Sequence, residues 1–278
     1  VLKVGLAHAG VFRTLDATRA AQAALVPGLP APAVAVLNAD DDRVASLQWL
    51  TAARVVWFGL DERADPRAED LSATATGTSF TLVCDGYRRT VKLRILGEHH
   101  VMNALATIAA VRELGVPLDA AVAAIEAVTR AERWRMEILN PGGGITVIND
   151  AYNASPDSTA AALKTLAQIV EPGQRSVAVL GEMTELGEVS DEEHDRIGRL
   201  VVRLNVQKLV VVGNGARHIH NAAGLEGSWD GESVLVASAD EAYDLLREEL
   251  REGDIVLVKS SKSAGLRFLG DRLGGIDS

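Results

Sequence analysis

Residues 145–158 read ITVINDAYNASPDS, and this stretch decides the fold expected for the second half of the chain. Its first four residues are β-branched and mostly apolar, as in a strand buried on both faces of a parallel sheet. A polar and aromatic cluster follows: Asn149, Asp150, Tyr152 and Asn153. Ser155 then suits a helix N-cap and Pro156 the first helical position. The stretch predicts a strand, a loop and a helix. The loop is either a ligand site at the carboxyl edge of a sheet or a plain cap and turn.

Further apolar runs of strand length follow this stretch: 176–180, 209–212, 233–236 and 255–258. Helical stretches of ten or more residues separate most of them. Such alternation is typical of a Rossmann-like domain with a parallel sheet. We place the start of this domain near residues 129–133.

In the first half of the chain, strand-like runs also alternate with helical stretches. Strand-like runs at 1–8, 33–38 and 54–58 are separated by helical stretches at 15–25 and 41–50. Two strand-like runs, 74–83 and 88–95, then flank the turn pair Asp85–Gly86, and helices are expected at 99–114 and 118–129. The fold class predicted for the whole chain is therefore α/β, with two domains.

Composition excludes several classes of protein. The chain has 278 residues, 47% of them hydrophobic, which suits two globular domains. Its formal net charge of −10 argues against a nucleic-acid surface. No apolar run approaches the roughly 20 residues of a membrane span. Cys84 is the only cysteine, so we expect no disulfide and a reducing, cytoplasmic location.

Two polar clusters outside the 145–158 stretch could bind a nucleotide. In GEHHVMN, residues 97–103, His99 and Asn103 lie four apart on one helix face and could hydrogen-bond a base. An ordinary helix start explains them equally well. In ERWRMEI, residues 132–138, an arginine at 133 or 135 could hold a phosphate, or both could lie on a solvated strand edge.

Two later stretches could form further loops at a strand end. LGEMTELGEVSDEEH, residues 180–194, fits either a substrate loop or an acidic turn that favours a helix dipole. GDIVLVKSSKSAGL, residues 253–266, carries Lys259 from a strand to a helix start, a geometry that suits anions. GNGARH, residues 213–218, follows a strand but lacks the third glycine of a dinucleotide fingerprint.

Eight motifs in order give the chain a family resemblance: VGLAH, LNADDD, GEHHVMNALA, ERWRME, INDAYNASPDS, LGEMTELG, HDRIG and VLVKSSKSAGL. Together they resemble the Mur ligases over essentially the whole chain. The Tyr-Asn form of the 150–158 motif and the Gly-Glu-Met loop are most similar to the member that adds a dipeptide.

The resemblance implies a fold and a reaction. Residues 1–131 would be the later part of a parallel-sheet ATPase domain that lacks its phosphate-binding loop, and residues 132–278 a Rossmann-like C-terminal domain. The implied reaction joins D-alanyl-D-alanine to UDP-N-acetylmuramoyl-tripeptide, using ATP and Mg²⁺ and passing through an acyl phosphate. The implied remainder of the ligase, an N-terminal portion, would lie in a longer chain or in a separate one.

The resemblance also assigns roles to individual residues. Those implied to be catalytic are Arg135, Asp150 and Lys259. Those implied to bind nucleotide are His99, Asn103, Arg135 and Asp150. Those implied to contact substrate are Tyr152, Asn153, Ser158, Glu182 and Met183. His8 is implied to be associated with Mg²⁺.

Three departures from the family pattern bear on activity. The sequence contains no G-x-x-x-x-G-K-[ST] phosphate-binding loop. After VGLAH it reads GVFRT, where the family commonly has Gly-Glu-Phe-Gly-Ser. In an ungapped alignment Gln22 occupies the position of a lysine that is carbamylated in relatives to help hold Mg²⁺. Either the alignment slips there, or metal binding is weakened.

Three functions therefore compete. The chain is part of a working ligase, or a degenerate paralogue that binds nucleotide or a partner without turnover, or another ligase of the superfamily such as a folylpolyglutamate synthase-like or cyanophycin synthetase-like enzyme. Gln22 and Val11 favour the second. The intact motifs in residues 132–278 favour the first, and the AYNASPDS and GEMTELG loops argue against the third.

Overall fold

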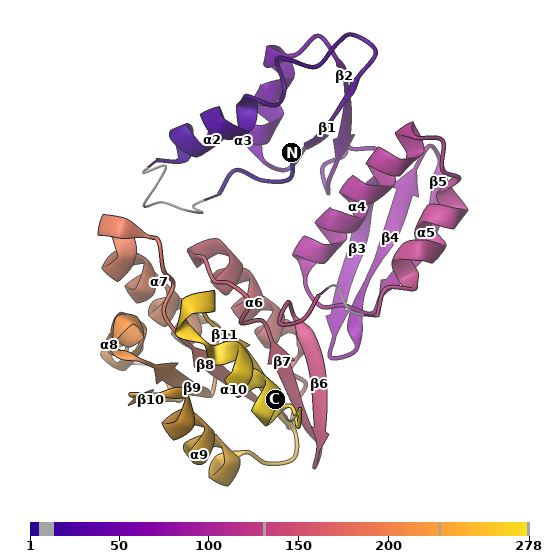
Figure 1. The fold of residues 1–278 in the computed structure, drawn as a ribbon. Helices are drawn as coiled ribbons and strands as arrows, with labels where there is room; N and C mark the ends of the chain where they lie inside the picture. The colour runs from indigo at the N-terminus through magenta and orange to yellow at the C-terminus, as the bar shows by residue number, and fades with distance from the viewer. Residues whose placement is uncertain (6–13, 130–131, 228, 277–278) are drawn as a thin grey trace. The chain divides into compact units, whose positions relative to one another are not determined.

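The structure is a computed structural model that describes residues 1–5, 14–129, 132–227 and 229–276. The chain forms two compact units (Figure 1). The N-terminal unit comprises residues 1–73 and 77–129, and the C-terminal unit comprises residues 74–76 and 130–278. No helix among the described residues is long and apolar enough to cross a membrane.

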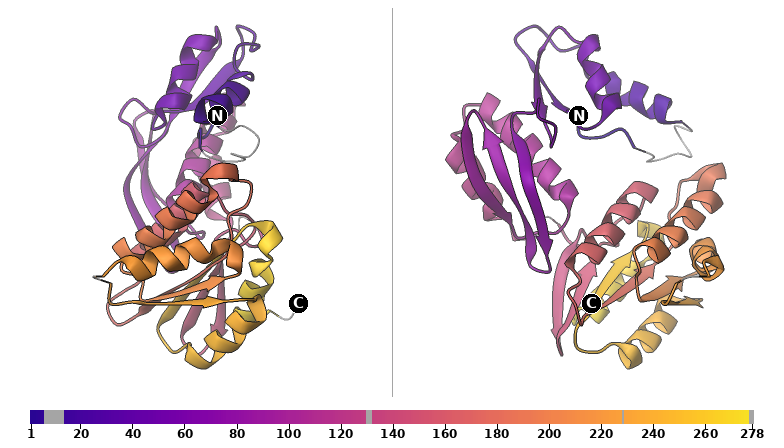
Figure 2. Two further views of the ribbon diagram at one scale, coloured as in Figure 1. Left: turned by 90° about the vertical axis from the view of Figure 1, so that its left-hand side faces the viewer. Right: turned by 180° about the vertical axis from the view of Figure 1, so that it is seen from behind.

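The C-terminal unit is a six-stranded sheet between two layers of helices. Its strands are β6 (Glu137–Gly142), β7 (Ile145–Asn149), β8 (Arg175–Leu180), β9 (Lys208–Val212), β10 (Glu232–Val236) and β11 (Asp254–Lys259). Their order is β10-β9-β8-β11-β7-β6, and all are parallel except β6, which runs antiparallel to β7. One face is covered by α6 (Pro156–Ile169), α7 (Ser190–Arg203) and α8 (Arg217–Leu225), the other by α9 (Ala239–Glu249) and α10 (Leu266–Leu273) (Figures 1 and 2).

The central strands of this sheet are buried on both faces. β9 and β11 are buried along their whole length, and β8 at every residue but its first. This explains their continuous Val, Ile and Leu runs, since helices cover both faces of a parallel sheet. The chain leaves β8 and β11 toward opposite faces, to α7 and α10. The loops after these two neighbouring strands therefore flank the switch point of the sheet, where α/β proteins bind ligands.

The N-terminal unit contains two small sheets. β1 (Val34–Asn38) and β2 (Arg54–Phe58) form a parallel pair, next to α2 (Leu15–Ala23), α3 (Asp42–Ala45) and the 3₁₀ helix η1 (Ser46–Leu50). The second sheet has the order β3-β4-β5, from β3 (Arg67–Thr74), β4 (Gly77–Cys84) and β5 (Tyr87–Leu93). It packs with α4 (Glu98–Glu113) and α5 (Leu118–Glu126) around a core that includes Phe58, Phe80, Leu82, Leu105 and Ile108.

The structure corrects several sequence predictions. Two strands, β3 and β6, were not predicted. β3 alternates half-buried and exposed residues in a polar sequence, and β6 carries Pro141, which edge strands tolerate. The helix predicted at 41–50 is split into α3 and η1.

The strand predicted at residues 1–8 is not formed by residues 1–5, and the rest of it lies outside the described residues. Val1 nevertheless lies along β1: its ammonium donates to the Val36 carbonyl at 2.7 Å, and the Asn38 N–H donates to the Val1 carbonyl at 3.2 Å.

Candidate active site

The loop after β7 is built as the sequence predicted, from a buried strand into a capped helix. Ser155 is the N-cap of α6, and Pro156 opens the helix. The Ser155 hydroxyl accepts from the Ser158 N–H at 3.3 Å, and the Ser158 hydroxyl accepts from the Ser155 N–H at 2.9 Å. This reciprocal capping box fixes the direction of the loop. Ser158 therefore has a structural role at the helix start.

Asp150 and Lys259 form a buried ion pair at the carboxyl edge of the sheet. The Lys259 ammonium donates to Asp150 Oδ2 at 2.6 Å and to the Asn153 carbonyl at 3.1 Å. The Lys259 side chain is only 2% exposed. Asp150 Oδ1 accepts from the Met136 N–H at 3.1 Å. The carboxylate thus joins the start of β6 to the end of β11, and Lys259 contributes by holding Asp150 and the 150–153 loop in place.

Arg135 lies on an aromatic ring that is shared with a second cation. Its guanidinium carbon is 4.1 Å from the Tyr152 ring centroid, and the Lys262 ammonium is 5.8 Å from the same centroid. Both distances are within the range of cation–π attraction. The Tyr152 N–H also donates to the Trp134 carbonyl at 3.0 Å. The side chains of Arg135 and Lys262 are exposed, so they form a small cationic surface on Tyr152.

Arg133 has a different role, which the sequence left open. Its guanidinium is 2.8 Å from Asp271 Oδ1, and the Trp134 indole N–H donates to Asp271 Oδ2 at 2.9 Å. Asn149, which is fully buried, donates to the same carboxylate at 3.1 Å. Arg133 and Asn149 therefore anchor the 133–137 segment on α10, and Arg135 is the arginine that is available to a ligand.

The loop after β8 is tied to two neighbouring elements. The Met183 N–H donates to His194 Nε2 at 2.9 Å, and His194 Nδ1 lies 2.7 Å from the Ser190 carbonyl. Since Nε2 must accept, Nδ1 carries the proton and the imidazole is neutral. The Ser261 N–H donates to the Glu182 carbonyl at 2.9 Å, and the Ser261 hydroxyl accepts from the Thr184 N–H at 2.8 Å.

The two predicted residues of this loop face different surroundings. The Met183 side chain is 1% exposed, with its sulfur 3.5 Å from the Thr159 hydroxyl, so Met183 shapes the loop from inside. Glu182 is half-buried and keeps part of its surface open to solvent. His194 and Ser261 were not predicted. The HDRIG and KSSKS motifs contain them, but the sequence does not show that His194 folds back onto Met183 or that Ser261 meets Thr184, 77 positions away.

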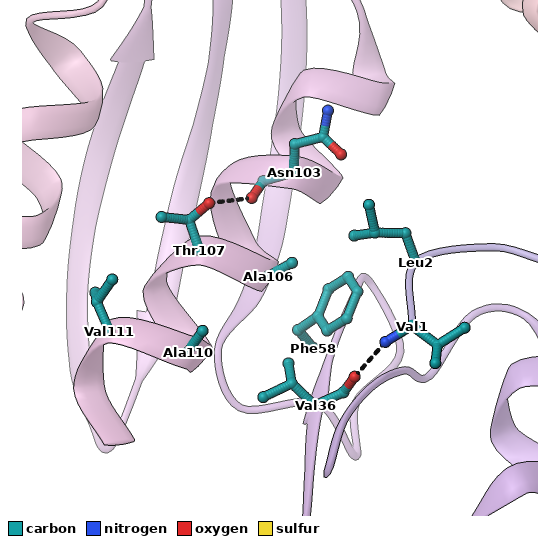
Figure 3. A pocket seen from close by; sticks show the side chains of 9 residues that line it. All are labelled: Val1, Leu2, Val36, Phe58, Asn103, Ala106, Thr107, Ala110 and Val111. Atoms are coloured by element: carbon teal, nitrogen blue, oxygen red, sulfur yellow. Dashed lines mark hydrogen bonds between the residues drawn. The ribbon is translucent and has the colours of Figure 1, made fainter. Parts of the chain in front are cut away.

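His99 and Asn103 lie on α4 in the N-terminal unit and face different surroundings. The His99 ring folds back over Gly97, where a Cβ would lie 2.6 Å from it, and its centroid is 4.1 Å from that of His100. Asn103 lines a pocket of about 610 Å³ (Figure 3). In this pocket the α4 residues lie opposite residues of β1 and β2 and the first two residues of the chain: Val1, Leu2, Val36, Phe58, Asn103, Ala106, Thr107, Ala110 and Val111.

The described residues do not by themselves form a metal site. His8 lies outside them, and within them no group of three His, Cys, Asp or Glu side chains could hold a metal ion. Gln22 lies on α2, where its buried Oε1 has no hydrogen-bond partner in the described structure. An amide oxygen is uncharged, so Gln22 would attract Mg²⁺ less strongly than a carboxylate would.

Comparison with protein-family models gives two matches. The model described as the Mur ligase middle domain matches residues 1–111. The model described as Mur ligase, glutamate ligase domain matches residues 134–262.

Curated relatives match over almost the whole chain. A UDP-N-acetylmuramoyl-tripeptide–D-alanyl-D-alanine ligase of Mycobacterium tuberculosis is 44% identical over 100% of this chain and 58% of its own length. The protein of the same name from Escherichia coli is 30% identical over 96% of this chain and 57% of its own length. The chain thus spans just under three fifths of these relatives.

Solved structures share the fold. A structure of MurF from Acinetobacter baumannii superposes with a TM-score of 0.85 at 26% identity, covering 98% of this chain and 58% of that one. MurF from Thermotoga maritima in complex with ADP gives a TM-score of 0.83 at 21% identity, over 98% of this chain and 60% of that one.

Proposed function

Because the chain belongs to the Mur ligase family, with its middle and C-terminal domains, we propose that it carries those parts of an ATP-dependent, ADP-forming ligase. We infer that this ligase joins D-alanyl-D-alanine to UDP-N-acetylmuramoyl-tripeptide in the synthesis of a peptidoglycan precursor. The relatives of that name, which match the whole chain, support the choice of substrates. The domain limits we propose are 1–131 and 132–278.

One observation carries the proposal: an exposed arginine is held on Tyr152 beside the buried Asp150–Lys259 pair. In the proposed reaction a peptide carboxylate receives the terminal phosphoryl group of ATP, and ADP leaves. The amine then attacks the acyl phosphate and phosphate leaves. Both steps move negative charge on phosphate oxygens, and a fixed guanidinium can bind two such oxygens at once. The Tyr152 ring restricts the directions in which Arg135 points.

Asp150 retains acceptor capacity for a nucleotide. One of its oxygens accepts from Met136 and the other from Lys259, and each carboxylate oxygen can accept a second hydrogen bond. A ribose hydroxyl is a donor of the required kind. Asn103, on the exposed face of α4, offers an amide that could pair with a base. Asp150 in the C-terminal unit and Asn103 in the N-terminal unit are each a candidate for contact with a nucleotide.

A chimera would test the function. The chain replaces the matching part of the 44% identical Mycobacterium tuberculosis relative, and amide product and ADP are measured. We expect turnover that depends on both the tripeptide precursor and the dipeptide. The chain alone should give none, because residues 1–278 contain no phosphate-binding loop to hold the β- and γ-phosphates.

Point variants of the chimera test the site. Arg135→Ala and Asp150→Ala should each lower turnover by at least about tenfold, or 1.4 kcal/mol of transition-state stabilisation. Arg196→Ala is the matched control: Arg196 is also 47% exposed and also pairs with a glutamate three residues earlier. Normal turnover in the Arg135 or Asp150 variant would remove that residue from the site.

A second candidate is a paralogue that binds nucleotide or a partner without turnover. Gln22 favours it, because it places an uncharged amide on α2 where the ungapped alignment with the family places a lysine. A folded chimera that binds ATP but forms no amide, and that gains activity with Gln22→Lys, would support this candidate over the first.

A further inference from the structure

The backbone around Glu182 is fixed by three hydrogen bonds to two neighbouring elements. Its carbonyl accepts from the Ser261 N–H, and the next two N–H groups along the chain donate to His194 and to the Ser261 hydroxyl. These contacts come from α7 and from the loop after β11. The loop that carries Glu182 is therefore held to its neighbours, and the side chain starts from a defined point beside the switch point of the sheet.

The Glu182 side chain packs closely against Gly215 in the loop after β9, where only a glycine leaves room for it. A Cβ added to Gly215 would lie 2.4, 2.5 and 3.0 Å from the three atoms of the Glu182 carboxylate. The carboxylate therefore lies directly against the backbone of the loop after β9. The second glycine of GNGARH, which the sequence could not explain, provides this space. Its backbone is not in the left-handed region, so its small size is what the position requires.

No cation among the described residues, whether Lys, Arg or His, forms an ion pair with this carboxylate. Other carboxylates of the C-terminal unit do form ion pairs: Asp150 with Lys259, Asp254 with Arg175 and Asp271 with Arg133. A half-buried carboxylate loses hydration, and this loss is normally offset by a partner. A fixed, unpaired carboxylate at the ligand-binding edge is thus complementary to a cation brought by a ligand.

Resting on the proposed function, we infer that Glu182 binds the terminal ammonium group of the incoming dipeptide. An ammonium group is a compact cation with three donors, which a single carboxylate can bind. Mg²⁺ fits less well, because it prefers six oxygen ligands and no second carboxylate joins Glu182 in a metal-holding group within the described residues. Arg135 and Lys262, the two cations that lie on the Tyr152 ring, are at a different part of the same edge. They are suited to bind the anionic groups of the substrates.

The inference is tested by NMR titration of the chain with D-alanyl-D-alanine and with its N-acetyl derivative, which lacks the ammonium group. The wild-type chain should bind the free dipeptide at least about tenfold more tightly, the equivalent of 1.4 kcal/mol. Glu182→Gln should bind both peptides equally. Gly215→Ala keeps the charge but displaces the carboxylate, and should also lose most of the preference. Glu188→Gln removes one charge from an exposed site nearby and should keep it.

Each outcome decides the inference. It is overturned if the wild-type chain binds neither peptide, if it shows no preference, or if Glu182→Gln retains the preference. Failure of the proposed function gives a different result. In that case L-alanyl-L-alanine binds as tightly as the D,D dipeptide, while the preference for a free ammonium group still depends on Glu182.

Discussion

The two units use similar amounts of chain but organise their cores differently. The C-terminal unit places β8, β9 and β11 at the centre of one sheet, with helices on both faces. The N-terminal unit divides its strands between a parallel pair and a three-stranded sheet. Strand β2 is buried only at its last residue, whereas β9 is buried throughout. The C-terminal unit therefore differs from the N-terminal unit in having one sheet whose central strands are buried along almost their whole length.

Ion pairs show the same contrast. Asp254 in the C-terminal unit is fully buried and pairs with Arg175, 21% exposed, at 2.6 Å. In the N-terminal unit Arg54 pairs with Glu113, and these side chains are 60% and 28% exposed. Buried pairs are costly to break and exposed ones are not. The C-terminal unit therefore depends on internal electrostatics in a way that the N-terminal unit does not.

The largest expected effect is on the folding of separate fragments. Residues 132–278 should fold alone, because the six strands and five helices of the described part of this unit make up their own core. Residues 1–129 should unfold at lower temperature and less cooperatively. Circular dichroism melts of both fragments check this. A disordered 132–278 fragment, or an equally stable 1–129 fragment, would show that the contrast between the units is wrong.

Breaking one ion pair in each unit sharpens the contrast in electrostatics. Asp254→Asn should lower the free energy of unfolding by about 3 kcal/mol, because the Arg175 charge is left partly buried without a counterion. Glu113→Gln should cost less than about 1 kcal/mol, because water replaces its partner. Urea unfolding of the intact chain measures both. Similar losses in the two variants would refute the distinction.

The N-terminal unit also has a closed core around β4, and thiol reactivity can test this. Cys84 is 1% exposed, and burial, together with a hydrogen bond to Asp65, raises the pKa of its thiol to about 12. The folded state therefore keeps the thiol protonated at pH 8, whereas the unfolded chain is partly ionised. Alkylation should be at least about a hundredfold slower in the native chain.

Two measurements accompany this prediction. The alkylation rate of urea-unfolded chain provides the control for reagent access. In the native chain the rate should rise about tenfold per pH unit between pH 8 and pH 11, as the thiolate fraction grows toward the raised pKa. Equal native and unfolded rates would show that this core opens freely.

The smallest expected effect concerns glycines in the helix pair of the C-terminal unit. A Cβ at Gly198 in α7 would lie 2.3 Å from the Ile219 carbonyl oxygen in α8, whereas nothing lies within 4 Å of one at Gly224. Gly198→Ala should cost about 1–3 kcal/mol because the helices must separate. Gly224→Ala, the matched control, should stabilise by up to about 1 kcal/mol. Thermal melts that show no difference would mean that the two helices move apart easily.

The sequence predicted most strands because they form continuous apolar runs, and β8, β9 and β11 have such runs because they are buried on both faces. β2 was placed with its correct ends, and β8, β9 and β11 within a residue or two. It missed β3 and β6, where side chains are partly exposed and charged or turn-forming residues weaken the pattern. A pattern of hydrophobicity follows burial, so it identifies central strands better than edge strands.

For the candidate site, the sequence identified clusters but not contacts. It placed Asp150, Tyr152, Glu182 and Lys259 near strand ends, where the structure has them. It gave no sign that the Lys259 ammonium is bound to Asp150, because the two residues lie 109 positions apart. Their roles in a reaction remain a proposal.

The contacts of Ser261 bear on the order in which the C-terminal unit folds. Besides its two contacts with the loop after β8, its hydroxyl lies 3.4 Å from the Ala154 carbonyl, 107 positions away in the chain. Contacts between such distant residues are slow to form because long loops must close first. The three loops can come together only after β7, β8 and β11 have paired, so we expect this surface to form after the sheet of the C-terminal unit.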